Sequence, residues 1–143
     1  MQRKIISFFT FLLVLALSIG FVGCKETRES TSIVRTEKQE NLFAIYFEEA
    51  GEGEKLIDVM KSLKKKGELT YVLENGMLME MNGKANAADF SACWMLYTTD
   101  EELSNSAWGT VEYDGKTLGS AMFGANDMPV VTGETYVWVY QIY

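Results

Sequence analysis

The sequence has no histidine and only two cysteines among its 143 residues. Histidine is the commonest general base in enzymes, so its absence excludes Ser–His and Cys–His catalytic pairs. It also removes the most frequent metal ligand, and two cysteines alone are too few for a structural zinc site. Phosphate-binding loops of the GxxxxGKS/T or GxGxxG pattern do not occur either. We therefore predict that the protein is not an enzyme and has neither a metal site nor a cofactor of its own.

The N-terminus has the layout of a secretory signal peptide. Arg3 and Lys4 precede an uncharged apolar run over residues 5–22, and a small residue then precedes Cys24. Residues 21–24 resemble a lipobox, in which the cysteine is diacylated and becomes N-terminal. We predict a lipoprotein signal peptide over residues 1–23 and a lipid anchor at Cys24, because two acyl chains give stable membrane attachment. Phe21 stands where a lipobox has an aliphatic residue, so an uncleaved signal anchor remains the alternative.

Both alternatives place the rest of the chain on the extracytoplasmic side of the cell membrane. Residues 24–40 are polar, highly charged and poor in aromatic residues, which is the composition of a flexible tether. A random chain of that length spans roughly 20–25 Å. Once Cys24 is lipidated, Cys93 is the one remaining cysteine. Its apolar surroundings in the sequence indicate a buried and unreactive thiol.

Acidic residues outnumber basic ones, with 20 Asp and Glu against 13 Lys and Arg. The signal peptide removes two of the basic residues, so the exported part is more acidic than the whole chain. A surface of this sign repels nucleic acid phosphates and anionic lipid headgroups. We therefore expect no nucleic acid partner, and we expect the lipid anchor alone to hold the domain near the membrane.

Residues 41–143 are predicted to form one domain. Apolar residues Leu56, Val59, Met60 and Leu63 recur at helical spacing, which predicts a helix over residues 54–66 that ends before Gly67. Strands are predicted over residues 42–47, 69–73, 77–81, 93–98, 110–113, 117–123 and 135–143. Asn-Gly and Asp-Gly pairs after residues 74, 81 and 113 indicate hairpin turns. The pattern indicates an α+β fold, with one helix packed on a mixed, mostly antiparallel sheet.

Two aromatic residues are candidate contacts for a ligand or partner. Trp108 and Tyr113 lie in or beside the polar stretch 100–107, which is predicted to be a loop. Exposed aromatic side chains on loops often anchor a bound partner. Each could instead cap the edge of the hydrophobic core, and the sequence leaves both interpretations open.

Four segments resemble motifs of one known domain family. Residues 56–60 are similar to a helix opening of T-L-x-D-x-L type, and residues 79–83 to a strand that ends in Asn-Gly. Residues 90–97 resemble an aromatic strand of W-x-L-Y type, and residues 132–140 resemble a closing G-D/E-x-Y strand. These motifs are similar to those of the DUF4430 family, a domain like the C-terminal domain of transcobalamin and intrinsic factor. The family has a hairpin before its helix, whereas only one strand is predicted there in this chain.

The resemblance implies a β-grasp-like fold over residues 41–143 and an exported surface protein. Our first functional hypothesis is a lipid-anchored, non-catalytic binding or interaction module for an unknown surface protein or small ligand. The alternative is a capture protein for a corrinoid or cobalamin-type ligand that works with a transporter. Corrinoid binding comes only from analogy with the family, so no corrinoid contact is assigned to a residue.

Overall fold

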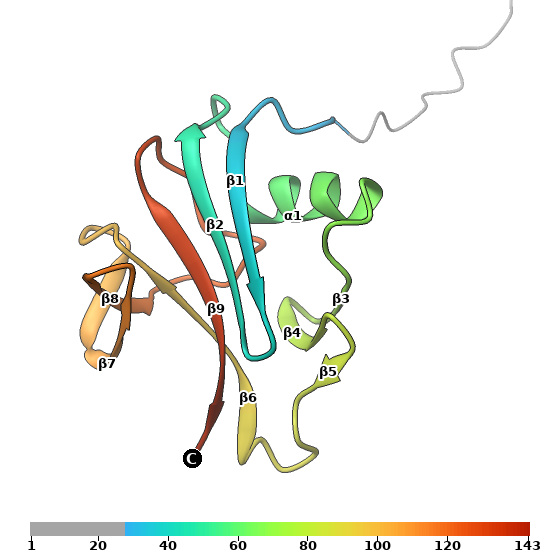
Figure 1. Cartoon of the computed structure of the whole chain (residues 1–143), viewed down its shortest axis with the longest axis vertical. Helices are drawn as coiled ribbons and strands as arrows, with labels where there is room; N and C mark the ends of the chain where they lie inside the picture. Colours follow the sequence, from blue (N-terminus) through green and yellow to red (C-terminus); the bar gives the residue numbers. More distant parts are fainter. Residues whose placement is uncertain (1–27) are drawn as a thin grey trace, which may run out of the picture.

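The computed structural model describes residues 28–143, which form one helix and nine strands in two sheets (Figure 1). The predicted signal peptide and the predicted lipidation site Cys24 lie outside the described residues. The predicted α+β class is confirmed. Each strand pairing within residues 28–143 is antiparallel, so the parallel pairing that a mixed sheet requires is not found there. In spatial order the large sheet contains β1 (Ile33–Gln39), β2 (Leu42–Glu49), β9 (Thr135–Ile142), β6 (Ala92–Thr98), β8 (Lys116–Ala121) and β7 (Ser104–Tyr113).

Strand β9 lies between β2 and β6 and separates two hydrophobic clusters. Tyr136 and Trp138 belong to the larger cluster, whereas Val137 belongs to the smaller cluster on the other face of the sheet. This alternation confirms the strand predicted over residues 135–143, because successive side chains of a strand point to opposite faces. Tyr136 is fully buried and meets Phe47 edge-on, with ring centroids 5.2 Å apart. The Tyr136 hydroxyl donates to the Pro129 carbonyl at 3.0 Å, so its polar atom is satisfied inside the core.

Helix α1 (Leu56–Lys65) covers the larger cluster, and the predicted apolar stripe is its buried face. The helix ends where expected, because Gly67 has a φ of 78°, which L-residues rarely adopt. At the other end, the backbone N–H groups of Leu56 and Ile57 donate to carbonyls of residues 128 and 125 at 2.9 and 3.0 Å. In the part of the chain that the structure describes, no helix has the length and apolar character needed to cross a membrane.

A small sheet packs beside the helix and closes the same cluster. It contains β3 (Tyr71–Glu74), β4 (Met77–Met81) and β5 (Lys84–Ala85). The predicted hairpin turns are confirmed, since Asn75, Asn82 and Asp114 and the glycines after them all have positive φ. That geometry is typical of the tight turns whose twist matches the strands they connect.

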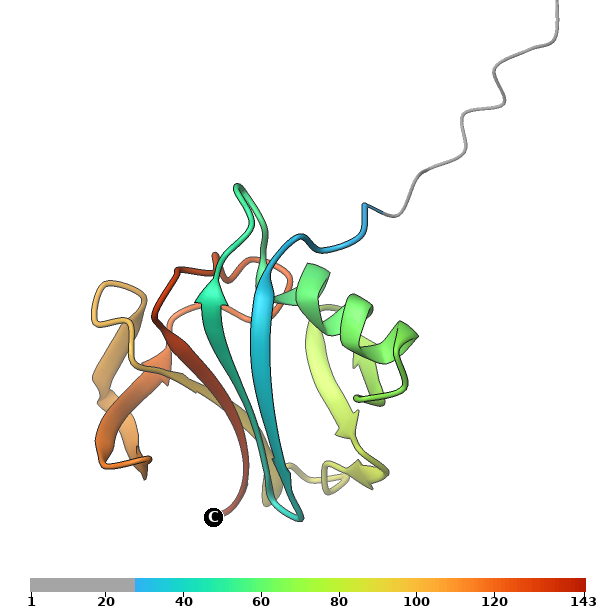
Figure 2. The same cartoon turned by 45° about the horizontal axis from the view of Figure 1, so that its top comes forward.

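The β7–β8 hairpin departs from the rest of the large sheet. Strand β8 pairs with β6 at only two positions, Tyr97 with Ser120 and Thr98 with Gly119. The hairpin lies on the far side of the sheet from α1 (Figure 2). The predicted loop over residues 100–107 is too long, because β7 begins at Ser104. The register of β7 against β8 shifts between Asn105 and Thr110. This bulge interrupts the regular alternation of side chains, so the first half of the strand could not be recognised in the sequence.

The predicted flexible tether over residues 24–40 is wrong for its second half. Strand β1 occupies Ile33–Gln39 and pairs with β2 along its whole length. Backbone pairing supplies hydrogen bonds whatever the side chains are, and an edge strand with a polar outer face needs few apolar residues. Of its side chains, Val34 packs against the larger cluster. The β1–β2 hairpin therefore precedes the helix, and the folded domain begins before residue 41.

Residues 30–32 are also fixed, by a buried carboxylate that we call the Glu54 clasp. Glu54 is only 6% exposed. One of its oxygens accepts hydrogen bonds from the backbone N–H and hydroxyl of Thr31, at 2.5 and 2.9 Å. The other accepts from the hydroxyls of Ser30 and Ser32, at 2.6 and 2.7 Å. Burial would raise the pKa of this carboxyl, but the four hydrogen bonds outweigh burial and lower it from 4.5 to about 2.

Replacing Glu54 should loosen the start of the domain. We expect Glu54→Gln to reduce the free energy of unfolding by about 2 kcal/mol or more, because hydrogen bonds to a charged group are worth more than neutral ones. Urea denaturation of the variant measures the loss. Glu52→Gln is the matched control, because Glu52 is exposed and two residues away. Equal stability of the two variants would show that the clasp contributes nothing.

The clasp also predicts an acid dependence of stability. Glu54 binds its proton less readily in the folded state, with a pKa of about 2 against 4.5. Its contribution is therefore complete above pH 4.5 and is lost as the pH falls from 4.5 towards 2. The loss should amount to about 3 kcal/mol over that window. Denaturation series at decreasing pH should show a shallower decline in Glu54→Gln than in Glu52→Gln. If the free energy of unfolding falls equally with pH in both variants, the acid dependence does not come from Glu54.

Candidate functional site

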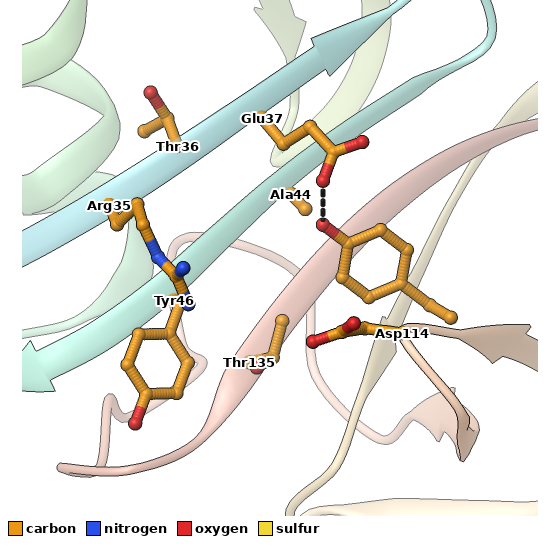
Figure 3. Close-up of a pocket in the computed structure, with 8 residues that line it drawn as sticks. Arg35, Thr36, Glu37, Ala44, Tyr46, Asp114 and Thr135 are labelled. Atoms are coloured by element: carbon orange, nitrogen blue, oxygen red, sulfur yellow. Dashed lines mark hydrogen bonds between the residues drawn. The ribbon is translucent and has the colours of Figure 1, made fainter.

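A polar hollow of about 270 Å³ lies between β1 and the turn of the β7–β8 hairpin (Figure 3). We call it the β1–β7 cleft. It lies on the face of the large sheet opposite α1, beside the smaller hydrophobic cluster. The lining residues are Arg35, Thr36, Glu37, Ala44, Tyr46, Tyr113, Asp114 and Thr135. The two edge strands of the sheet approach each other here because the hairpin curls across that face.

The strand register places small side chains at the floor of the cleft. Ala44 lies opposite Glu37, and Thr135 lies opposite Tyr46. Both small residues are buried on the central strands β2 and β9. Longer side chains stand on either side of them, as the labelled residues in Figure 3 show. The hollow exists because short residues in the middle of the sheet leave space between taller neighbours.

One wall of the cleft is cationic and aromatic. The Arg35 guanidinium lies 5.0 Å from the centroid of the Tyr46 ring, which is its cross-strand neighbour. This distance is within the range of a cation–π contact. Among residues 28–143, the ion pairs are Lys55 with Asp127 and Lys65 with Glu29. Arg35 therefore has no carboxylate partner within that part of the chain, and its fork of donors can take an anionic group.

The other wall is closed by a hydrogen bond between the two edge strands. The hydroxyl of Tyr113, the last residue of β7, donates to the Glu37 carboxylate at 2.5 Å, which is the dashed line in Figure 3. Tyr113 reaches this point because the Asp114-Gly115 turn follows it directly. Burial, and then the hydrogen bond to Glu37, raise the pKa of Tyr113 to about 12. The bonds from Tyr113 and Gln39 lower the pKa of Glu37.

Both shifts fix the charge state of the cleft. A general acid or base works best when its pKa lies near the working pH. At the cleft, both pKa values move away from neutrality, so Glu37 stays ionised and Tyr113 stays protonated. Within the described residues, no three His, Cys, Asp or Glu side chains converge on a possible metal position. Cys93 is buried as predicted, its pKa is raised by burial, and it does not line the cleft.

The structure separates the two aromatic residues that the sequence singled out. Tyr113 lines the cleft, partly buried, where it touches both a candidate site and the smaller cluster. Trp108 lies in the bulged part of β7, is 63% exposed and does not line the cleft. The interpretation of Trp108 as a cap on the core is therefore wrong. Its possible role as a partner contact remains a prediction.

Sequence reasoning missed the residues on β1. Arg35 and Glu37 fell within the predicted tether, where charges are ordinarily solvated. Their alternation with Val34 and Thr36 was the available signal, since alternating polar and less polar residues indicate a strand. Tyr46 lies within the strand predicted over residues 42–47, but nothing in the sequence marked it as a partly buried residue beside Arg35.

A second hollow, of about 370 Å³, is more apolar. It lies between the β3–β4 turn and the end of β8, and exposed Met77, Met122 and Phe123 contribute to its lining. Trp94 and Trp138 lie at its inner side. The Trp138 indole N–H is buried and has no hydrogen-bond partner among the residues that the structure describes. The residues around this hollow carry no charged group, which distinguishes it from the β1–β7 cleft.

No family model, curated protein or solved structure matches the chain. The similarity to DUF4430 motifs therefore remains a prediction from the sequence.

The cleft geometry predicts how Glu37 should titrate. Because Tyr113 is the largest cause of its lowered pKa and Gln39 the second, Tyr113→Phe should raise the Glu37 pKa towards its usual value. Gln39→Ala should raise it by less. Carbon-detected NMR titration of the Glu37 carboxyl measures both effects. If the two variants titrate alike, or if neither differs from the parent, the bond between the edge strands is not formed in solution.

Proposed function

We propose that the protein is a lipid-anchored, non-catalytic binding module whose β1–β7 cleft holds a small polar ligand outside the cell. The observation that carries this proposal is Arg35, a guanidinium stacked on Tyr46 and without an ion-pair partner in the described residues. Binding proteins keep such a donor available for an anionic group of the ligand. The anchor at Cys24 comes from the sequence alone and lies outside the described residues.

The chemistry around Arg35 suggests a ligand with charges of both signs. Glu37 and Asp114 line the opposite side of the same cleft, where they can accept an ammonium or other donor. Tyr46 and Tyr113 supply aromatic surface between these charges. A volume of about 270 Å³ is near the lower end for ligand pockets. An amino acid, a short peptide end or a similar zwitterion fits this size and charge pattern.

We also propose that the fold is β-grasp-like and that the chain belongs to the DUF4430 family. The β1–β2 hairpin ahead of α1 supports this, because the family has a hairpin at that position and the sequence alone predicted a single strand. The helix packed across one face of the sheet is also compatible with it. Corrinoid capture has less support, since it comes from analogy with the family alone.

Binding is tested with the exported chain carrying Cys24→Ser, so that no lipid is present. Thermal shift and NMR titration against amino acids and short peptides should identify a ligand, because a bound ligand stabilises by RT ln(1 + [L]/Kd). Arg35→Gln should weaken its binding roughly tenfold or more, the value of one charge-assisted hydrogen bond. Lys38→Gln is the matched control, because Lys38 lies on the same strand and does not line the cleft.

Two results would contradict the proposal. The first is the absence of any shift with zwitterions at concentrations far above micromolar. The second is a ligand whose affinity is the same in Arg35→Gln and Lys38→Gln. A shift of the visible spectrum on adding a corrinoid would favour the alternative instead.

A further inference from the structure

The exposed face of α1 concentrates positive charge in an acidic protein. Lys61, Lys64, Lys65 and Lys66 are all exposed, and no acidic residue lies between Asp58 and Glu68. These lysines are four of only 13 basic residues in a chain with 20 acidic ones. The opposite face of the helix is buried in the core. The lysine face is therefore a basic surface that the described part of the chain covers only in part, through residues 28–30 and through the bond from the Lys64 ammonium to the Tyr71 carbonyl at 3.1 Å.

The start of the described chain lies directly against this surface. Arg28, Glu29 and Ser30 share a shallow hollow of about 210 Å³ with Asp58, Lys61, Ser62 and Lys65 of the helix. Lys65 forms an ion pair with Glu29, and Arg28 adds another positive charge beside it. The carboxylates of Glu29 and Asp58 offset part of this charge. Arg28, Lys61 and Lys65 nevertheless outnumber these two acids among the residues that line the hollow.

Chain length places this surface close to the proposed anchor. Four residues lead from Cys24 to Arg28, and a fully extended chain of that length spans at most about 14 Å. The Glu54 clasp fixes Ser30–Ser32 to the loop that precedes α1. The domain cannot move its helix far from a membrane to which Cys24 is attached. A distance of this order is comparable to the Debye length of about 10 Å at 0.1 M salt.

We propose that the lysine face of α1 docks on the anionic headgroups of the membrane that holds Cys24. The inference rests on the anchor in the proposed function and adds an orientation to it. Lysines near an anionic surface are attracted to it, whereas the acidic remainder of the domain is repelled. Docking through α1 turns the β1–β7 cleft away from the membrane, because the turn of the β7–β8 hairpin lines the cleft. That hairpin lies on the far side of the sheet from α1 (Figure 2). The ligand site is then open to the exterior.

The test uses the mature lipoprotein reconstituted into vesicles of phosphatidylcholine, with or without phosphatidylglycerol. A water-soluble acetylating reagent reports the accessibility of each lysine by mass spectrometry. Lys61 and Lys66 should react several-fold more slowly on the anionic vesicles than on the neutral ones, and added salt should restore their reactivity. Lys38 and Lys116, which are exposed on the large sheet, are internal controls and should react alike on both vesicles.

Paired charge reversals separate a docking surface from a general charge effect. Lys61→Glu with Lys66→Glu should remove the protection of Lys64 and Lys65 on anionic vesicles. Lys38→Glu with Lys116→Glu changes the net charge equally and should leave that protection intact. The docking proposal would be overturned if both double variants lost the protection of Lys64 and Lys65 equally. It would also be overturned if Lys61 of the unchanged protein reacted equally on neutral and anionic vesicles.

Failure of the anchor gives a different result from failure of docking. Without a lipid on Cys24, the protein does not float with neutral vesicles, and its N-terminal peptide lacks the mass of the acyl chains. If the protein floats and carries the lipid but its lysines react uniformly, the anchor stands and the docking surface is refuted.

Discussion

The two-sided burial of strand β9 is the constraint on which the rest of the structure depends. Tyr136 and Trp138 require cover on one face, and Val137 requires cover on the other. Helix α1 and the small sheet supply the first cover, and the curled β7–β8 hairpin supplies part of the second. Because these covers differ in size, the first face becomes a closed core. The second face keeps an open margin, and the β1–β7 cleft forms there.

The Glu54 clasp connects that core to the beginning of the chain. A buried carboxylate is unfavourable unless hydrogen bonds compensate for its lost hydration. Here Ser30, Thr31 and Ser32 provide four. The result is a domain that is folded almost up to the proposed anchor. If Cys24 is lipidated as we propose, so short a connection keeps one side of the domain towards the membrane, whereas a long flexible tether would allow every orientation.

The two faces of the large sheet differ in charge as well as in how they are covered. The lysine face of α1 and the cleft lie on opposite faces of the large sheet, and each combines charges in a different way. The helix gathers lysines beside Arg28, where we propose that anionic headgroups bind. The cleft sets the Arg35 guanidinium, which has no ion-pair partner among residues 28–143, against the carboxylates of Glu37 and Asp114. Two tyrosines line the same cleft. Its ionised Glu37 and protonated Tyr113 are suited to hold a ligand by fixed charges and donors.

Local patterns in the sequence determined the helix, its glycine end, the hairpin turns and the alternation of β9, because each depends on neighbouring residues. The burial of Cys93 followed from its apolar neighbours in the same way. Strand β1 could not be recognised, because pairing with β2 and the distant Glu54 fix its place despite a polar composition. The cleft also depended on tertiary structure. Arg35, Tyr113 and Asp114 come together only when the two edge strands meet, and that approach is decided by how the whole sheet curls over its core.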